Sequence, residues 1–501
     1  MVRTQECGGS EAGKRRGRIV IIGGGSAAFA AATAAAPLAA SVTIVNKGLP
    51  MGGCCVNVGC VPSKFLIQAA RFGAAYCVRP PYHGISEAAD RVDNFTALTA
   101  QNRELTERLR REKYADVIAG LDNVQYVEGF GTLVRNEGQL AVAVRKHRSD
   151  GIVDQELPAD RVILATGVHN SLPDGLAKDL SDVGYLTNED AYFQTARPES
   201  LVVLGGGYVA VEAAQMFARL GSRVTLLQRS STILSHLDDS IGTALAGYLE
   251  EEGIKVVSGC DVKTVTMSRD GQVLVTAEAG GRSHCFAASK LFVATGRRAN
   301  TALVSDLPVQ LAETPHGGFV VSPTLQTSVP DVYAAGDCVA GSPQYVYTAA
   351  AEGKLAALNA LASLDGRTEE AMDYSVVPWV VFTSPAVAGV GLDVRSARAR
   401  GIDADASTLP LSLLPRAIAQ QDTRGFVTLV RNRSDDTIIG ALVLAEDGGE
   451  LVMEASFCVR YKVKVSDVAA MYHPYLTWNE AWKLAALGFA KNVKQLSCCA
   501  T

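Results

Sequence analysis

The sequence predicts an α/β protein made of two strand–glycine turn–helix units and a C-terminal α+β domain. Each unit opens with a short apolar strand, at 18–22 and 201–204, that runs directly into three consecutive glycines. From residue 370 onward, alternating apolar runs at 376–382, 425–430 and 438–444 are typical of an antiparallel sheet. A chain of 501 residues exceeds the ~250–300 that one hydrophobic core usually supports, so several domains are expected.

The composition is that of an ordinary globular protein. Apolar residues make up 48% of the chain and charged residues 20%, which argues against disorder, collagen and coiled coil. The net charge of −5 gives no indication of a nucleic-acid partner. Eleven cysteines are too sparse to form a disulfide framework in a chain of this length. Thiols outside a catalytic pair are expected to stay reduced, as they do in the cytoplasm.

One stretch, 19–46, follows the basic run 14–18 and could be taken for an export signal or a membrane span. It is interrupted by Gly23–Gly25 and Pro37, whereas a membrane helix needs about 20 uninterrupted apolar residues. A buried strand, a glycine turn and an alanine-rich helix explain it better. We therefore expect a cytoplasmic protein with no membrane partner, and a disordered tail at 1–16.

The first glycine turn has the pattern G-x-G-x-x-A of a Rossmann-like, dinucleotide-binding unit. Gly23 and Gly25 would let the backbone approach a pyrophosphate at a helix N-terminus, and Ala28 would keep helix and strand close together. Gly205, Gly207 and Ala210 repeat the pattern. One such pattern is a weak signal, but two in one chain predict two bound dinucleotides.

The residue that ends the second strand of such a unit should contact a ribose. In the second unit, Gln228 and Arg229 occupy this place instead of an acid, which suits a 2′-phosphate and favours NADPH over NADH. In the first unit, Asn46 and Lys47 replace the usual acid, so the recognition of that ribose stays open.

Between the two glycine turns, Cys55 and Cys60 form a C-x4-C pair. A metal site would need two further ligands, and no histidine lies close by in the sequence. A redox-active disulfide is the better interpretation. A helix N-terminus lowers the pKa of a thiol, and the thiolate is the form that attacks disulfides and binds soft metals.

The segment from Gly52 to Lys64 resembles the active-site motif of the pyridine nucleotide-disulfide oxidoreductases, the family of glutathione reductase, dihydrolipoamide dehydrogenase and mercuric reductase. Further family landmarks at 165–167, 294–297 and 334–337 extend the resemblance over essentially 17–501. It implies a homodimer that uses FAD and NADPH. The domains it implies are an FAD-binding domain at 17–165 and 296–369, an NADPH-binding domain at 166–295, and a dimerisation domain at 370–501.

By this resemblance, Cys60 forms a charge-transfer thiolate against the flavin and Cys55 exchanges with the substrate. Lys64 is expected to pair with Glu212, since such a pair compensates a buried charge. Cys54 stands where the family usually has threonine. The residues assigned to the two cofactors are Gly23, Gly25, Ala27, Ala28, Gly48, Cys54, Lys64, Gly131, Thr166, Gly167, Gly205, Gly207, Ala210, Gln228, Arg229, Gly296, Asp337 and Val346.

The chain ends in a second dithiol, Cys498 and Cys499, which lies too near a C-terminus to be good structural material. Mercuric reductases and the large thioredoxin reductases both carry such a tail. Disulfide reductases have a His-Pro with a Glu five residues after the His as a general acid. Here that position holds Trp478, and Glu480 comes seven residues after His473. The chain is therefore more similar to mercuric reductases.

Hg(II) is soft, favours two thiolates in a line and is chelated by small thiols in the cytosol. The resemblance implies that Cys498 and Cys499 strip these ligands and pass the ion to Cys55 and Cys60 of the partner subunit, so that all four cysteines bind metal. NADPH would then reduce FAD, and FAD the metal, with release of Hg(0).

Tyr114 and Tyr475 match the active-site tyrosines of mercuric reductases and would steady the ion or its thiolates. His473 departs from the aromatic residue more usual there. It keeps a second hypothesis open, an NADPH-dependent thiol-disulfide reductase similar to thioredoxin reductase. A metal-buffering protein with a vestigial flavin fold is a third. The isolated Cys77, Cys260, Cys285, Cys338 and Cys458 are expected to be small buried hydrophobic residues.

Overall fold

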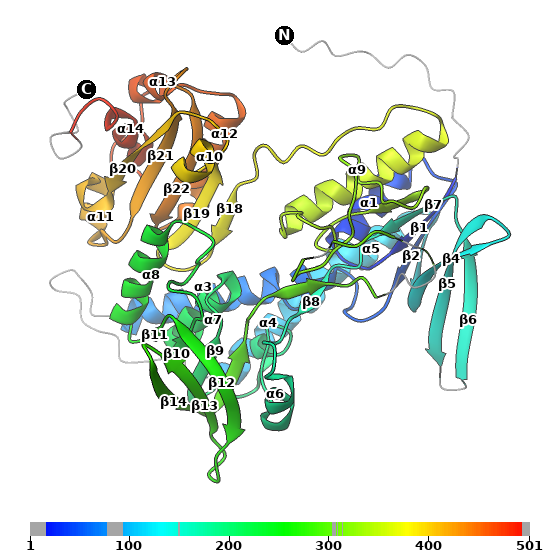
Figure 1. The fold of residues 1–501 in the computed structure, drawn as a ribbon, viewed down its shortest axis with the longest axis horizontal. Helices are drawn as coiled ribbons and strands as arrows, with labels where there is room; N and C mark the ends of the chain where they lie inside the picture. Colours follow the sequence, from blue (N-terminus) through cyan, green and yellow to red (C-terminus); the bar gives the residue numbers. More distant parts are fainter. Residues whose placement is uncertain are drawn as a thin grey trace. The chain divides into compact units, whose positions relative to one another are not determined.

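The computed structural model describes residues 17–77, 94–148, 151–302, 307, 309–312 and 314–492. The tail at 1–16 and the dithiol Cys498 and Cys499 lie outside these residues. The chain divides into two compact units (Figure 1). The first unit contains the described residues up to 62, 103–170 and 297–372; the second contains 63–102, 171–296 and those from 373 on.

The first unit is built on a five-stranded parallel sheet in the order β17-β7-β1-β2-β3. Its strands are β1 (Arg18–Ile22), β2 (Ser41–Asn46), β3 (Val124–Glu128), β7 (Arg161–Leu164) and β17 (Val332–Ala334). Residues 19–22 are buried without alternation, as expected for a parallel strand covered on both faces. The predicted strand, glycine turn and helix at 18–35 are confirmed.

Helices α1 (Ser26–Ala35) and α9 (Val346–Leu364) lie side by side in this unit (Figure 1). Their facing residues are mostly alanine and glycine, which allows a close approach. At Gly353 the helices are so close that a Cβ would clash with the Ala27 carbonyl. Two antiparallel sheets complete the unit. Their strands are β4 (Phe130–Asn136), β5 (Gln139–Arg148) and β6 (Gly151–Pro158) in one, and β8 (Val168–Asn170) and β16 (Arg297–Ala299) in the other.

The second unit contains the second parallel sheet, in the order β11-β10-β9-β15, and a three-stranded antiparallel sheet. The parallel strands are β9 (Ser200–Leu204), β10 (Arg223–Leu227), β11 (Lys255–Val257) and β15 (Lys290–Val293), with helices α6 (Ala177–Val183), α7 (Tyr208–Arg219) and α8 (Asp239–Glu251). The antiparallel strands are β12 (Cys260–Met267), β13 (Val273–Ala279) and β14 (Arg282–Ala288).

The same unit holds a five-stranded antiparallel sheet in the order β18-β19-β22-β21-β20, as predicted for residues 370 onward. Its strands are β18 (Trp379–Val381), β19 (Ala386–Gly391), β20 (Ala404–Pro410), β21 (Phe426–Asn432) and β22 (Ile438–Ala445). The helices of this region are α10 (Val394–Ala399), α11 (Pro415–Gln420), α12 (Gly448–Arg460), α13 (Val465–Ala470) and α14 (Glu480–Leu487).

Two long helices, α3 (Cys60–Cys77) and α4 (Phe95–Arg110), cross the boundary between the units, and α4 continues through a π-helical turn at 111–115 into α5 (Asp116–Ala119). In the part of the chain that the structure describes, no helix is long and apolar enough to cross a membrane.

The prediction for the isolated cysteines is partly wrong. Cys260, Cys338 and Cys458 are buried, but Cys285 is exposed. Cys285 lies on β14, the edge strand of its sheet, where only Phe286 and Ala288 of the strand face the core. The side chain of Cys77 lies outside the described residues.

Candidate active site

The first glycine turn forms a tight cradle between β1 and α1. Gly23 has a φ of +129°, and a Cβ there would clash with the Ala165 carbonyl at the end of β7. Gly25 is the N-cap residue of α1, and among the residues that the structure describes no side chain accepts a hydrogen bond from the N–H groups at this end of the helix. The first turn of Ser26–Ala35 also carries no acidic residue. The positive end of the helix is therefore open to an anion, and the site fits the pyrophosphate of a dinucleotide.

The second glycine turn repeats this geometry between β9 and α7. Gly205 has a φ of +114°, and a Cβ there would clash with the Ala294 carbonyl that follows β15. Gly207 caps Tyr208–Arg219, again without a side-chain cap or an acid in the first turn. A Cβ on Gly207 would meet nothing within 4 Å. The two units thus present two matching dinucleotide cradles.

Asn46, at the end of β2, has a fixed amide orientation. Its Nδ2 donates to the Leu49 carbonyl at 2.9 Å and to the Tyr126 hydroxyl at 2.8 Å, which uses both N–H groups. The amide lies against Gly24. An oxygen acceptor therefore remains where a ribose-binding acid would stand. Lys47 is occupied elsewhere, because its Nζ pairs with Glu128 at 3.2 Å.

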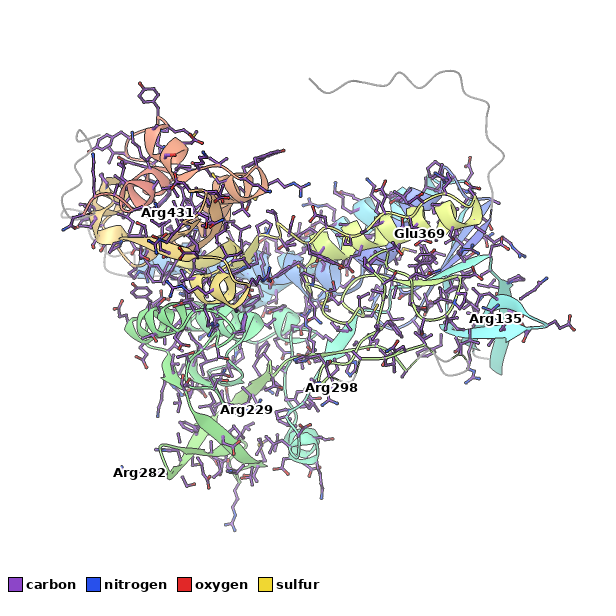
Figure 2. The ribbon with its side chains drawn as sticks, turned by 45° about the horizontal axis from the view of Figure 1, so that its top comes forward. Arg135, Arg229, Arg282, Arg298, Glu369 and Arg431 are labelled. Atoms are coloured by element: carbon purple, nitrogen blue, oxygen red, sulfur yellow. The ribbon has the colours of Figure 1, made fainter. Side chains whose placement is uncertain are left out.

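In the second unit the corresponding residues are Gln228 and Arg229. Gln228 packs against Gly206, and its Nε2 donates to the Thr232 carbonyl at 3.4 Å. Arg229, labelled in Figure 2, is exposed directly after β10 and forms no ion pair with any residue that the structure describes. A cation at this place is suited to a 2′-phosphate.

The cysteine motif spans a short helix, α2 (Gly53–Asn57), and the first residue of α3. Cys54 and Cys55 lie on α2, and Cys60 opens Cys60–Cys77, whose first turn carries no acid. The positive end of a helix of this length stabilises a thiolate at Cys60. Cys54, which replaces the usual threonine, has its Sγ packed against Gly59.

Asn57 closes the loop that precedes the cysteines. Its buried Nδ2 lies within hydrogen-bond distance of the Pro50, Met51 and Gly53 carbonyls, at 3.1, 3.0 and 2.8 Å. Arg110 donates to Asn57 Oδ1 at 3.2 Å. The sequence analysis did not predict these hydrogen bonds of Asn57, because nothing in the sequence distinguishes a structural asparagine from the other residues of the motif.

Tyr114 lies close enough to the cysteine pair to be affected by it. Burial raises the pKa of the Tyr114 phenol, a hydrogen bond with Ser26 lowers it, and Cys55 and Cys60 raise it further. The ring packs edge-on against Phe29 at 4.8 Å between centroids. The structure therefore brings Tyr114 and the two cysteines together in the first unit.

Tyr347, on the first turn of α9, is a further phenol near Cys60 that sequence reasoning missed. Burial raises its pKa most, followed by Tyr345 and then by Cys60. Its ring stacks on Tyr345 with centroids 5.3 Å apart. No spacing in the sequence distinguishes this tyrosine from its neighbour.

Asp337 is carried by a turn that a buried carboxylate holds in place. Gly336 N donates to Glu352 Oε2 at 2.6 Å, and Ser342 donates to the other oxygen of Glu352. Burial raises the pKa of Asp337, and Arg297 lowers it. Glu352 is fully buried on α9, so it fixes the position from which Asp337 would reach the cofactor.

The remaining residues assigned to the cofactors lie on the strands, helices and turns of the two units. Gly131 on β4 packs against Ile22 and Val45, and Thr166 donates to the Asn300 carbonyl at 2.6 Å. Ala27 and Ala28 are buried on α1, Ala210 is buried on α7, and Val346 opens α9. Gly48, Gly167 and Gly296 adopt positive φ angles with open space where a Cβ would stand.

In the second unit, Lys64 Nζ pairs with Glu212 Oε2 at 2.8 Å, and this ion pair was predicted. Glu212 Oε1 accepts from Phe382 N at 2.8 Å, and Lys64 Nζ lies 4.7 Å from the centroid of the Phe382 ring. One helical turn further along α7, Gln215 accepts from Ser384 N and donates to Ser384 O, both at 2.8 Å. Helix α7 is thus anchored to 382–384.

Tyr475, the second predicted tyrosine, lies in the second unit between α13 and α14 and is 57% exposed. The side chain of His473, two residues earlier, is buried and bonds to Glu454 Oε1 at 2.8 Å. Cys498 and Cys499 lie outside the described residues, so their place relative to Tyr475 stays a prediction.

Comparisons with known proteins agree with this geometry. The family model described as "Pyridine nucleotide-disulphide oxidoreductase" matches residues 17–353, and the dimerisation domain of the same family matches 377–486. The mercuric reductase of Streptomyces lividans is 40% identical over 92% of this chain and 93% of its own length. The mercuric reductase of Shewanella putrefaciens is 38% identical over 92% of this chain and 79% of its own length.

Two solved structures share the fold. LpdA from Mycobacterium tuberculosis has a TM-score of 0.79 at 27% identity and covers 94% of this chain and 98% of its own. The flavoprotein disulfide reductase RclA from Escherichia coli has a TM-score of 0.80 at 24% identity, covering 95% of this chain and all of its own. The chain belongs to the pyridine nucleotide-disulphide oxidoreductase family.

Proposed function

We propose that this protein is an NADPH-dependent, FAD-containing mercury(II) reductase that releases Hg(0) from thiol-bound Hg(II). The observation that carries this proposal is the similarity to mercuric reductases along 92% of the chain, together with the C-x4-C pair on α2 and α3. The balanced reaction is Hg(SR)2 + NADPH + H+ → Hg(0) + NADP+ + 2 RSH. We assign it to the cytoplasm, where small thiols are kept reduced.

Cys55 and Cys60 hold the ion as a pair of thiolates, the ligand set that soft Hg(II) prefers. The N-terminus of α3 favours the thiolate at Cys60. Tyr114 lies beside the pair and can donate its hydroxyl to a thiolate, since burial keeps the phenol protonated. When bound, FAD and NADPH supply the two electrons of the reduction.

The C-terminal domain is a dimerisation domain, and it presents an apolar surface suited to a second copy of the chain. Met453, Phe457 and Tyr461 recur every four residues on α12 and its end, with exposures of 45%, 60% and 71%. Exposed apolar rows of this kind mark interfaces. We infer that each active site is shared, with Tyr475 and the tail dithiol reaching the partner subunit's cysteine pair.

The tail dithiol is expected to matter most for tightly chelated mercury. Replacing Cys498 and Cys499 by alanine should lower kcat/KM for glutathione-bound Hg(II) by at least about tenfold. The pair of Cys55 and Cys60 must then displace both glutathione ligands from the ion without help from the tail. The loss should be smaller with Hg(II) in weakly binding halide. Equal losses with both forms would contradict a role in ligand exchange.

A mixed dimer separates the two possible arrangements of tail and cysteine pair. One chain carries Cys60→Ser with its tail intact, and the other carries the intact pair with both tail cysteines replaced by alanine. For each intact cysteine pair, a kcat/KM for glutathione-bound Hg(II) restored above that of the tail-variant homodimer would support transfer between subunits. A value no higher than that of the tail-variant homodimer, in a mixed dimer of normal assembly, would exclude it.

NADPH preference is assigned to Arg229. Arg229→Ala should raise the KM for NADPH by about tenfold or more, since a charge-assisted contact contributes roughly 1.5–3 kcal/mol, and should leave the KM for NADH nearly unchanged. Arg223→Ala is the matched control, because Arg223 is likewise exposed, lies at the start of β10 and forms a surface ion pair with Glu199 at 2.9 Å. Steady-state kinetics with both coenzymes provides the comparison, and a parallel rise of both KM values would contradict the assignment.

A second candidate, a thiol-disulfide reductase, is favoured by one observation, the carboxylate that Glu454 places on His473. NADPH oxidation should therefore be compared with thiol-bound Hg(II), oxidised thioredoxin and glutathione disulfide as acceptors. We expect mercury to be turned over and the disulfides to be turned over poorly. Disulfide turnover without mercury turnover would reverse the assignment.

A further inference from the structure

One carboxylate holds both ends of the segment 473–479, which we call the Tyr475 loop. Glu454, on α12, bonds through Oε1 to His473 Nε2 at 2.8 Å and through Oε2 to Asn479 Nδ2 at 2.6 Å. The loop connects α13 to α14, so these two residues stand at its opposite ends. Because Glu454 lies on a regular helix, it ties the loop to the rigid part of the domain.

Burial separates the anchor of this loop from its tyrosine. The His473 side chain is 4% exposed, whereas Tyr475 is 57% exposed and the adjacent Tyr472 is 98% exposed. The imidazole therefore serves as an internal attachment point, and the tyrosines face outward. Within the loop, Leu476 N donates to Glu480 Oε2 at 3.3 Å, a longer and weaker contact than either bond to Glu454.

The bond between Glu454 and His473 depends on charge. Burial acts to raise the pKa of Glu454, but the hydrogen bonds from His473 and Asn479 and the charge of His473 together leave this pKa below its usual value. Glu454 raises the pKa of His473, while burial and Lys483 lower it. The other ionisable groups that face the pair are Cys458 on α12, whose pKa burial and Glu454 raise to about 11, and Glu480 on α14, whose pKa burial raises.

The sign of the pH dependence follows from these directions. The pKa of His473 is raised above its ordinary value. The charged pair is therefore fully formed at pH values below that ordinary pKa, and it weakens as the pH rises through the raised pKa. Glu454, with its lowered pKa, stays ionised over this range. The loop is thus held most firmly while His473 is protonated.

We propose that Glu454 is a positioning residue for Tyr475, fixing both ends of the loop so that the tyrosine hydroxyl meets the thiol-bound Hg(II) in a set place. This rests on the proposed function, which assigns Tyr475 to the partner subunit's metal site. His473 acts here through Glu454 and gives no proton to the substrate.

The test uses variants of the homodimeric holoenzyme and measures kcat and KM for glutathione-bound Hg(II) from about pH 6 to 9. Glu454→Gln keeps the volume and one acceptor but removes the charge, and should lower kcat by about tenfold at neutral pH, since a loosened loop misplaces the hydroxyl. Glu450→Gln, an exposed acid on the first turn of α12, is the matched control and should leave kcat unchanged.

Coupling to the tyrosine distinguishes positioning from general stabilisation. In a Tyr475→Phe background, Glu454→Gln should have little further effect on kcat, because the group it positions is already gone. If the two effects multiply instead, Glu454 acts independently of Tyr475 and the proposal is wrong.

His473→Gln tests the route through Glu454. Its side-chain amide can donate to Glu454 as imidazole Nε2 does, so kcat should stay within about threefold of the wild type while the decline at higher pH disappears. A collapse of kcat as large as that of His473→Ala would show that His473 itself handles a proton, and would overturn the proposal.

Amide hydrogen exchange gives a readout that needs no activity. Glu454→Gln should speed exchange at 475–478 relative to Glu450→Gln, with an unchanged dimer in sedimentation. If the wild type does not oxidise NADPH with Hg(II), the proposed function fails, yet this measurement still tests the anchor. Unchanged exchange in Glu454→Gln would refute the anchor itself.

Discussion

Replacing Cys60 by serine is expected to abolish Hg(II)-dependent NADPH oxidation, with a loss on the order of a thousandfold or more, as for removal of a catalytic nucleophile. The hydroxyl of serine does not ionise near neutral pH and is a poor ligand for a soft ion. Cys55→Ser should cause a loss of similar size, because two thiolates are needed to hold Hg(II) in a line. Steady-state kinetics of the purified variants measures both losses.

A spectroscopic difference separates the roles of the two cysteines. Cys60→Ser should lose the long-wavelength absorbance of the reduced enzyme, which we assign to the Cys60 thiolate against the flavin, and Cys55→Ser should retain it. Cys285→Ser is the matched control, because Cys285 is an exposed thiol on the edge strand β14. Retention of the absorbance in Cys60→Ser, or more than a few per cent of activity, would contradict the assignment.

Breaking the ion pair between Lys64 and Glu212 is expected to have the largest effect on stability. Lys64→Met leaves the Glu212 carboxylate, only 7% exposed, without its countercharge, and should cost about 3 kcal/mol of unfolding free energy. Glu212→Leu should cost about 2 kcal/mol, because Phe382 N loses its acceptor. Lys64, one third exposed, can regain water in that variant, so its charge adds little to this cost.

The double variant Lys64→Met/Glu212→Leu should be more stable than the sum of the two losses implies, with a coupling of at least about 1 kcal/mol in urea unfolding. The surface pair of Lys47 and Glu128, at 3.2 Å, is the control and should show a coupling of only about 0–1 kcal/mol. Additive losses at Lys64 and Glu212 would mean that the pair is not a coupled unit.

The sequence predicts best what is encoded locally. The two cradles follow from a strand, three glycines and a small residue within about ten positions, and both are present because only glycine fits where Gly23 and Gly205 meet a neighbouring carbonyl. The pair of Lys64 and Glu212, 148 residues apart, was predicted only through the family resemblance. No local pattern connects two residues at that separation.

The partner of His473 shows where sequence reasoning stops. Counting along the chain from His473 finds its next acid at Glu480, but the structure supplies Glu454 from α12, 19 residues upstream. The packing of α12 against the Tyr475 loop determines which acid pairs with His473, and the spacing of acids along the sequence does not reveal that packing. The predicted burial of Cys285 is wrong for a similar reason: cysteine is usually buried, but the first four residues of the edge strand β14, up to Cys285, are exposed to solvent.

The most direct test of the central claim is the amount of Hg(0) vapour released per NADPH oxidised, measured anaerobically with glutathione-bound Hg(II) and the wild-type homodimer. The balanced reaction requires one Hg(0) for each NADPH, with no Hg(0) from Cys60→Ser. NADPH oxidation without mercury vapour, or vapour that persists in Cys60→Ser, would contradict the account.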